Sequence, residues 1–296
     1  MRAARSTGRR PLALCASVVA MLAVSGCTTP DPIFDPNTPL PSTEDVLAGQ
    51  REAVRGLERV WARAVVQVDG ADPAGKKVNE QGEGVLQVVP PDRLALSLGK
   101  LGDTLLYLGS NEEWYWWFDL LDSNRRLAVL GRHALVTPDK AAELGVPVHP
   151  LDLIELLAIT PLPDDATVRG WDAIGRVIVE HPNRWGSRRV WLDPTDWRPW
   201  RVELLDRNGQ PLATAVLSDH ARASVEGDAL RSPWVAGRLE ITAAGFDGEV
   251  RVSLFEPRNQ RIREIAFDLQ RLADDVYKIN EVIDLDATPA PAGGAP

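Results

Sequence analysis

The chain has 296 residues, of which 42 are acidic and 33 are Lys or Arg, so its formal net charge is −9. This acidic balance argues against a nucleic-acid partner and against electrostatic adhesion to anionic lipid. Its two cysteines, Cys15 and Cys27, both lie near the N-terminus, so the rest of the chain has no thiol for a disulfide, a metal site or nucleophilic catalysis.

The N-terminus has the pattern of a bacterial lipoprotein signal. Four arginines within residues 1–10 precede an apolar stretch from about Leu12 to Val24, which is too short to span a bilayer. The stretch runs into Ser25-Gly26-Cys27, which resembles the lipobox, where the cysteine receives a diacylglyceryl group before cleavage. We therefore predict a signal peptide at residues 1–26 and lipidation of Cys27.

Two other signals are the alternatives. One is an ordinary secretory signal with a chance cysteine, and the other is a twin-arginine signal, of which only Arg9-Arg10 is present. Thr28 follows the cysteine where an Asp would indicate inner-membrane retention, which favours the outer membrane, facing the periplasm. Removing residues 1–26 takes away four arginines and no acids, so the charge moves from −9 to −13 and the lipid becomes the predicted membrane anchor.

Proline-rich or low-complexity segments flank the central part of the chain. Residues 27–42 hold five prolines, and this density favours an extended spacer. Residues 288–296 contain mainly Pro, Ala and Gly and are predicted to be a disordered tail. One large domain over residues 43–287 is expected between them.

This domain is predicted to begin with a helix and to continue with strands. Ser42 is a helix cap followed by acids. Apolar residues then recur at helical spacing and predict a helix to about residue 64; they are Val46, Val54, Leu57, Val60 and Trp61. The period then changes to two, which is typical of antiparallel strands. The strands expected here are residues 65–68, 84–89, 93–98, 104–108, 113–120 and 125–130.

Residues 138–160 interrupt the strands with two short helices, one opening at Pro138 and an apolar one at Pro150. Strands then resume. We therefore expect a mainly β (α+β) fold: a large curled antiparallel sheet of about ten strands, or half-open β-barrel, with an N-terminal helix and a helical insertion covering the concave side. The later strands are residues 176–180, 188–192, 200–206, 211–217, 238–242 and 249–255.

Four stretches in this order resemble the LolA/LolB superfamily of lipoprotein carriers and acceptors, and the similarity is closer to the outer-membrane acceptor, LolB. The resemblance covers about residues 43–285. The stretches are the strand–loop–strand unit at 91–106, the aromatic strand at 111–119, the proline-led helix at 146–157 and the late hairpin at 200–209.

The resemblance implies a hydrophobic cavity for lipoprotein or acyl-chain cargo and a protruding apolar loop that interacts with the membrane. Residues 99–103 match that loop, with Leu101 in the place of the protruding residue. The alternative is that Leu101 packs beneath an ordinary hairpin. An arginine of the carrier has no counterpart in Val88-Val89-Pro90-Pro91, which argues against a carrier role.

Cavity-lining candidates come from the aromatic strand and the apolar helix. Strand alternation places Trp114, Trp116 and Phe118 on one face, and Leu153 and Leu157 belong to a helix that either covers the cavity as a lid or covers a sheet. Core packing is the competing interpretation for the aromatic residues, and stacking on sugars is a lesser one.

No catalytic or metal motif is present, and we expect neither an enzyme nor a bound cofactor. The four histidines, at positions 133, 149, 181 and 220, are scattered, and there is no HExxH, Gly-x-Ser-x-Gly or phosphate-binding glycine loop. The predicted function is a lipid-anchored envelope protein that binds acyl chains, lipoproteins or another apolar ligand in lipoprotein sorting. The alternatives are a structural or assembly factor without cargo and, less favoured, an envelope enzyme or sugar binder.

Overall fold

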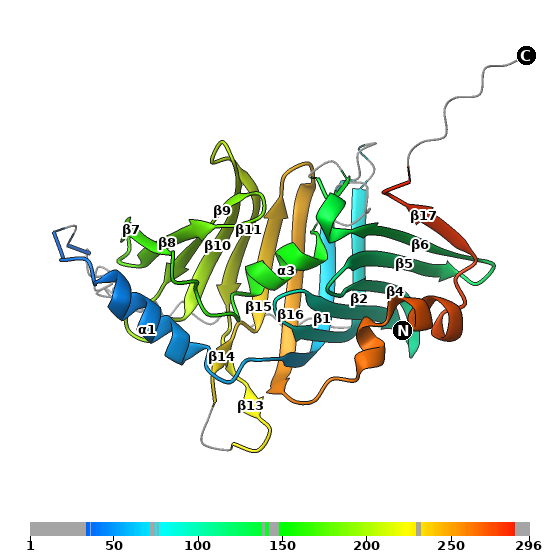
Figure 1. Cartoon of the computed structure of the whole chain (residues 1–296), viewed down its shortest axis with the longest axis horizontal. Coiled ribbons are helices and arrows are strands. Elements are labelled where there is room, and N and C mark those ends of the chain that lie inside the picture. Colours follow the sequence, from blue (N-terminus) through cyan, green and yellow to red (C-terminus); the bar gives the residue numbers. More distant parts are fainter. Residues whose placement is uncertain are drawn as a thin grey trace, which may run out of the picture. The chain divides into compact units, whose positions relative to one another are not determined.

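The computed structural model describes residues 34–35, 37–71, 75, 77–137, 140–141, 148–228 and 232–287. These residues form a large curled sheet with helical segments on both of its faces (Figure 1). Cys27, the predicted signal and the predicted tail lie outside the described residues, as does most of the helix predicted from Pro138.

Strands dominate the described part of the chain, which confirms the mainly β prediction. The helical segments are α1 Thr43–Ala53, η1 His133–Leu135, α3 Pro150–Leu157, η2 Glu264–Phe267, α4 Leu269–Arg271 and η3 Leu272–Val276. The strands are β1 Val60–Ala71, β2 Lys77–Val89, β3 Arg93–Lys100, β4 Asp103–Ser110, β5 Trp114–Asp122, β6 Arg125–Arg132, β7 Thr167–Trp171, β8 Val177–Pro182, β9 Gly186–Leu192, β10 Pro199–Asp206, β11 Pro211–Ser218, β12 Ala221–Arg222, β13 Ser224–Val225, β14 Trp234–Val235, β15 Arg238–Ala243, β16 Asp247–Asn259 and β17 Glu281–Asp284.

Two meanders meet at the centre of the sheet. The strand order is β17-β6-β5-β4-β3-β2-β1-β16-β15-β11-β10-β9-β8-β7, and β13 also pairs with β16. The long strands β1 and β16 join the halves, pairing antiparallel from Trp61 opposite Arg258 to Ala71 opposite Asp247. Pairing is antiparallel throughout the main order except between β17 and β6. The sheet is therefore open, with β17 and β7 at its two edges.

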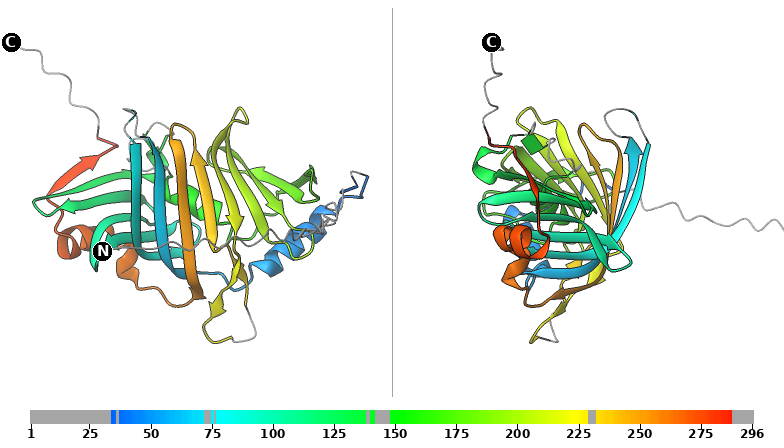
Figure 2. Two further views of the ribbon diagram at one scale, coloured as in Figure 1. Left: turned by 180° about the vertical axis from the view of Figure 1, so that it is seen from behind. Right: turned by 90° about the vertical axis from the view of Figure 1, so that its right-hand side faces the viewer.

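The position of α3 requires the sheet to curl. This eight-residue helix is about 12 Å long, yet it contacts both β4 and β10. Those strands lie seven steps apart in the strand order, about 34 Å on a flat sheet. Only a sheet that bends around the helix brings both within its reach, and Figure 2 shows this curvature. We call the face that α3 covers the inner face, and the opposite one the outer face.

The helix α1 is shorter than predicted. Ser42 caps it as expected, accepting a hydrogen bond from the Asp45 amide at 3.1 Å. The helix ends at Ala53 because the chain turns at Gly56, whose φ of 93° favours glycine. Val60 and Trp61, which we predicted to be helical, begin β1 instead. Their apolar spacing reflects burial at a strand end rather than another helical turn.

The predicted spacer is partly docked. The ring of Phe34 lies 5.0 Å from that of Trp171 on β7. The indole nitrogen of Trp171 also donates to the carbonyl oxygen of Thr38 at 2.9 Å. Phe34 and Thr38, in the proline-rich chain before α1, therefore contact the β7 edge of the sheet.

Candidate functional site

Leu101 is presented at the tip of the β3–β4 hairpin. Lys100 pairs with Asp103, so Leu101 and Gly102 form a two-residue turn. Both have positive φ, 54° and 95°, as in a type I′ turn. The turn points the Leu101 side chain into solvent, where it is fully exposed. The alternative in which Leu101 packs beneath the hairpin is therefore wrong.

The inner face is filled by α3. Pro150 fits the first helical position, where no backbone donor is needed, and His149 accepts a hydrogen bond from the Leu151 amide at 3.2 Å. The helix ends at Leu157 and is followed by the cap residue Ala158, whose φ is 51°. Its apolar residues pack on inner-face side chains of the strands, such as Leu94 and Leu204. The buried α3 side chains are Pro150, Leu151, Leu153, Ile154, Leu156 and Leu157.

A partly buried polar group, the α3 cluster, fixes the helix to the β8–β9 hairpin. Arg184 lies 3.8 Å from the Asp152 carboxylate and 3.4 Å from that of Glu155. Trp185 donates its indole N–H to Asp152 at 2.8 Å, and Arg188 donates to the Glu155 backbone carbonyl at 2.6 Å. Burial raises the pKa of Asp152 to about 6 despite these partners.

The aromatic strand β5 is divided between the two faces. Tyr115 and Trp117 face the inner core, whereas Trp116 and Phe118 belong to a separate core on the outer face. Residues 260–277, the C-terminal segment, cover that outer core. Within it, the Tyr107 hydroxyl donates to the Ala266 carbonyl at 2.7 Å.

The five predicted cavity-lining residues therefore do not share one cavity. Leu153 and Leu157 lie in the inner core, and Trp116 and Phe118 lie on the opposite side of the sheet, with Trp114 packed against them. Alternation correctly grouped the three aromatic residues. It could not identify which of the two strand faces would be concave.

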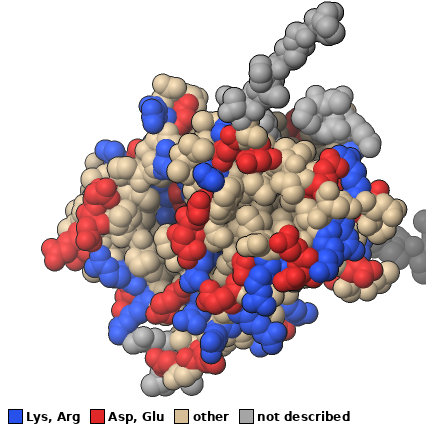
Figure 3. Space-filling view, turned by 45° about the vertical axis from the view of Figure 1, so that its right-hand side comes forward, with Lys and Arg blue, Asp and Glu red and all other residues tan. Residues whose placement is uncertain are grey.

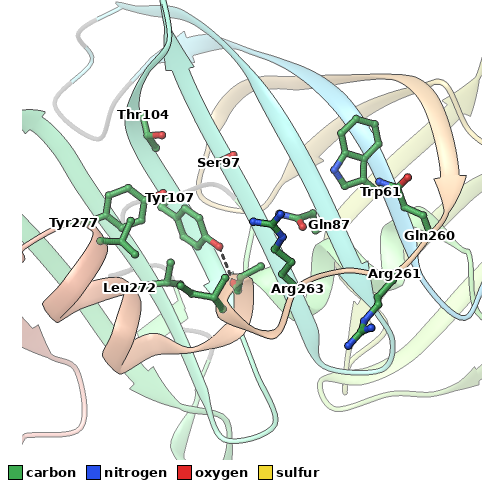
Figure 4. Close-up of a pocket in the computed structure, with 13 residues that line it drawn as sticks. Trp61, Gln87, Ser97, Thr104, Tyr107, Gln260, Arg261, Arg263, Leu272 and Tyr277 are labelled. Atoms are coloured by element: carbon green, nitrogen blue, oxygen red, sulfur yellow. Dashed lines mark hydrogen bonds between the residues drawn. The ribbon is translucent and has the colours of Figure 1, made fainter.

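Two pockets lie side by side on the outer face, of about 460 and 890 Å³. Ser97 and Thr104 line both, so we treat them as one depression, the outer groove. The smaller part lies between the strands and the C-terminal segment, where Arg263 reaches toward Gln87 (Figure 4). The larger part extends to the hairpin that carries Leu101. Sequence reasoning missed the smaller part because it assigned no structure to the C-terminal segment.

The described residues hold no group of three or more His, Cys, Asp or Glu side chains placed to ligate a metal. Nor does any helix within them have the length and apolar character needed to cross a bilayer. Acidic and basic side chains are intermixed over the face seen in Figure 3.

Neither a protein-family model nor a curated protein sequence matches the chain. Solved structures do resemble it. One is named as an outer membrane lipoprotein-sorting protein domain from Vibrio parahaemolyticus, with a TM-score of 0.52, 15% identity, and coverage of 77% of this chain and 97% of that one. A DUF1329 family protein from Desulfovibrio piger has a TM-score of 0.51 at 13% identity, covering 77% and 98%.

A LolA superfamily protein from Nitrosomonas europaea also has a TM-score of 0.51, at 10% identity, with the same coverage of 77% and 98%. At such identities the likeness concerns the fold and not the activity. The chain has the fold of the LolA superfamily.

Proposed function

We propose that this chain is a lipid-anchored protein of the bacterial cell envelope, held by Cys27 on the outer membrane and facing the periplasm. There it handles the acyl chains of lipoproteins or another apolar ligand, in the manner of LolB. The observation that carries this proposal is the fully exposed Leu101 at a hairpin tip of a LolA-like sheet.

Holding Leu101 exposed at the turn costs free energy unless its side chain contacts an apolar partner. A non-glycine residue in the left-handed region loses about 1–2 kcal/mol. A large apolar side chain in water forgoes a further 1.5–3 kcal/mol or so of burial energy. Insertion into lipid recovers the second amount, which supports a membrane-interacting role for the 99–103 loop.

The loop is tested by Leu101→Glu in the full-length protein. We expect the transfer of a diacylated lipoprotein into vesicles of phosphatidylethanolamine and phosphatidylglycerol to fall about tenfold, because a carboxylate resists entry into hydrocarbon. Leu121→Glu is the matched control, since Leu121 is also an exposed leucine near a hairpin of the same sheet. Equal transfer by the parent and both variants would contradict the loop's role.

The anchor is tested separately by Cys27→Ser. We expect the parent to incorporate radiolabelled palmitate and to fractionate with membranes, and the variant to lose both properties. Labelling that persists in the variant would place the lipid elsewhere.

The filled inner face favours a second candidate, an envelope structural or assembly factor that uses the fold without cargo. Leu156 and Leu157 of α3 are almost completely buried where an acyl chain would otherwise lie. Native mass spectrometry of the full chain purified from membranes separates the two candidates. A co-purifying lipid or acyl chain supports the ligand-handling function, and its consistent absence supports the factor without cargo.

A further inference from the structure

The outer groove has polar groups that the protein itself does not satisfy. Among the described residues, the side chains of Gln87, Ser97, Gln260 and Arg263 make no hydrogen bond or ion pair, although all four line the smaller pocket. The nearby Arg93 is different, because it pairs with Glu264 at 2.8 Å. Unused donors of this kind are available to a ligand.

The smaller pocket is also locally basic in an acidic protein. Arg261 and Arg263 both line it, and its described lining includes no carboxylate, whereas the chain as a whole carries nine more acidic than basic residues. A concave site lined by one sign of charge concentrates ions of the opposite sign. Guanidinium groups bind phosphate and carboxylate with paired hydrogen bonds. These features favour an anionic group near Arg263.

The larger pocket is different in character and continues toward the Leu101 hairpin. Its apolar lining includes Val65 and Phe255, and 46% of Phe255 is exposed. This part holds two cations, Arg63, which is paired with Glu256 at 3.0 Å, and Lys100, but its lining also includes the carboxylates of Glu83 and Asp103. The anionic end of a ligand is therefore favoured at Arg263 and an apolar end along Phe255.

We propose that the outer groove binds an anionic amphiphile, with its phosphate or carboxylate headgroup on Arg263 and its apolar chain directed past Phe255 toward Leu101. Gln87, Ser97 and Gln260 are placed to hydrogen-bond the ester or hydroxyl groups next to the anion. The combined size, about 460 and 890 Å³, suits a lipid-sized molecule. This goes beyond the proposed function, since it uses the face opposite α3 and needs no lipoprotein cargo.

The test is native mass spectrometry of the full chain in dodecyl maltoside, titrated with phosphatidylglycerol or with phosphatidylcholine of the same acyl chains. We expect the anionic lipid to bind at least tenfold more tightly. Arg263→Gln should reduce that binding to the level of phosphatidylcholine, and Phe255→Ser should weaken both lipids. Arg271→Gln is the control, because Arg271 is another arginine of the C-terminal segment that lines neither pocket.

Two results would overturn the inference. One is that the parent binds the two lipids with equal affinity, or that the parent and Arg263→Gln bind the anionic lipid with equal affinity. The other is binding of glycerol 3-phosphate as tightly as of phosphatidylglycerol, because a free phosphate compound would then account for the site without the apolar groove. Arg263 is exposed and unpaired, so its replacement should leave folding intact, which the thermal midpoint checks. If the lipids fail to bind while Leu101→Glu still blocks lipoprotein transfer, only this inference falls.

Discussion

The inner and outer faces of the sheet are covered in different ways. On the inner face, α3 fills the curve of the sheet with leucines, and the α3 cluster fixes it to the β8–β9 hairpin. On the outer face, the C-terminal segment seals the aromatic core around Trp116 but leaves the groove beside Arg263. The inner face is thus covered by a helix whose leucines are buried, whereas an open groove lies on the outer face beside the C-terminal segment.

The largest effect on stability should come from truncating an α3 side chain that packs on the inner face. Leu156→Ala is expected to lower the free energy of unfolding by about 2–5 kcal/mol, because its side chain is completely buried between α3 and the sheet. Urea denaturation measures this change. Ile174→Ala, at a residue that is 65% exposed, is the control and should stay within about 0.5 kcal/mol of the parent. A cost below 1 kcal/mol or so for Leu156→Ala would instead mark α3 as a loosely held lid.

A second, smaller effect is the change in stability with pH that the α3 cluster produces. The pKa of Asp152 is raised from 3.8 to about 6 by burial, so the folded protein holds this proton over a range in which the unfolded chain has lost it. Stability from this group is therefore present below pH 3.8 and is lost as the pH rises through about 6. The loss is about 3 kcal/mol at most.

Asp152→Asn should remove this loss, and the comparison requires denaturation curves of both proteins between pH 4 and 7. The difference between them is the quantity to measure, because burial also lowers the pKa of His149, which contributes a slope of opposite sign. Parallel pH profiles for the two proteins would show that Asp152 does not titrate in this range.

The smallest effect is expected on the outer face. Tyr107→Phe removes the hydrogen bond to the Ala266 carbonyl and should cost about 0.5–1.5 kcal/mol. Hydrogen exchange should accelerate mainly in the C-terminal segment, since this bond ties it to β4. Ser42→Ala, which removes the α1 cap at a similar cost of roughly 1 kcal/mol, should leave exchange in that segment unchanged. Uniform acceleration by Tyr107→Phe would mean that the two faces unfold together.

Local patterns predicted much of the fold. The strand alternation and the proline-led α3 depend on neighbours in sequence, and both are present. The exposed Leu101 was expected from the family resemblance instead. The helix α1 was overextended because Val60 and Trp61 continue its apolar spacing past the turn at Gly56. The β17–β6 pairing was not foreseen because a parallel pair joins segments that are far apart in the chain.

The outer groove was still harder to predict, because it is formed by segments that lie far apart in the chain. Alternation places Gln87 on one strand face, but no local pattern indicates that Arg263 crosses above it. The signal for the C-terminal segment was the helical spacing of Ile265, Leu269, Leu272 and Val276. Even with that helix assigned, its docking face and the space beneath it are set by tertiary packing.

In the proposed lipid-anchored form, the docking of Phe34 on Trp171 would limit the distance between the sheet and the membrane. With the lipid on Cys27, only seven residue-to-residue steps separate the anchor from Phe34, a reach of at most about 25 Å. A freely extending spacer that began at α1 would allow about twice that. The lipid would thus keep the β7 edge close to the bilayer. Phe34→Ser should release the docked chain, lengthen the connection to the lipid and widen the range of orientations that the sheet adopts above the bilayer.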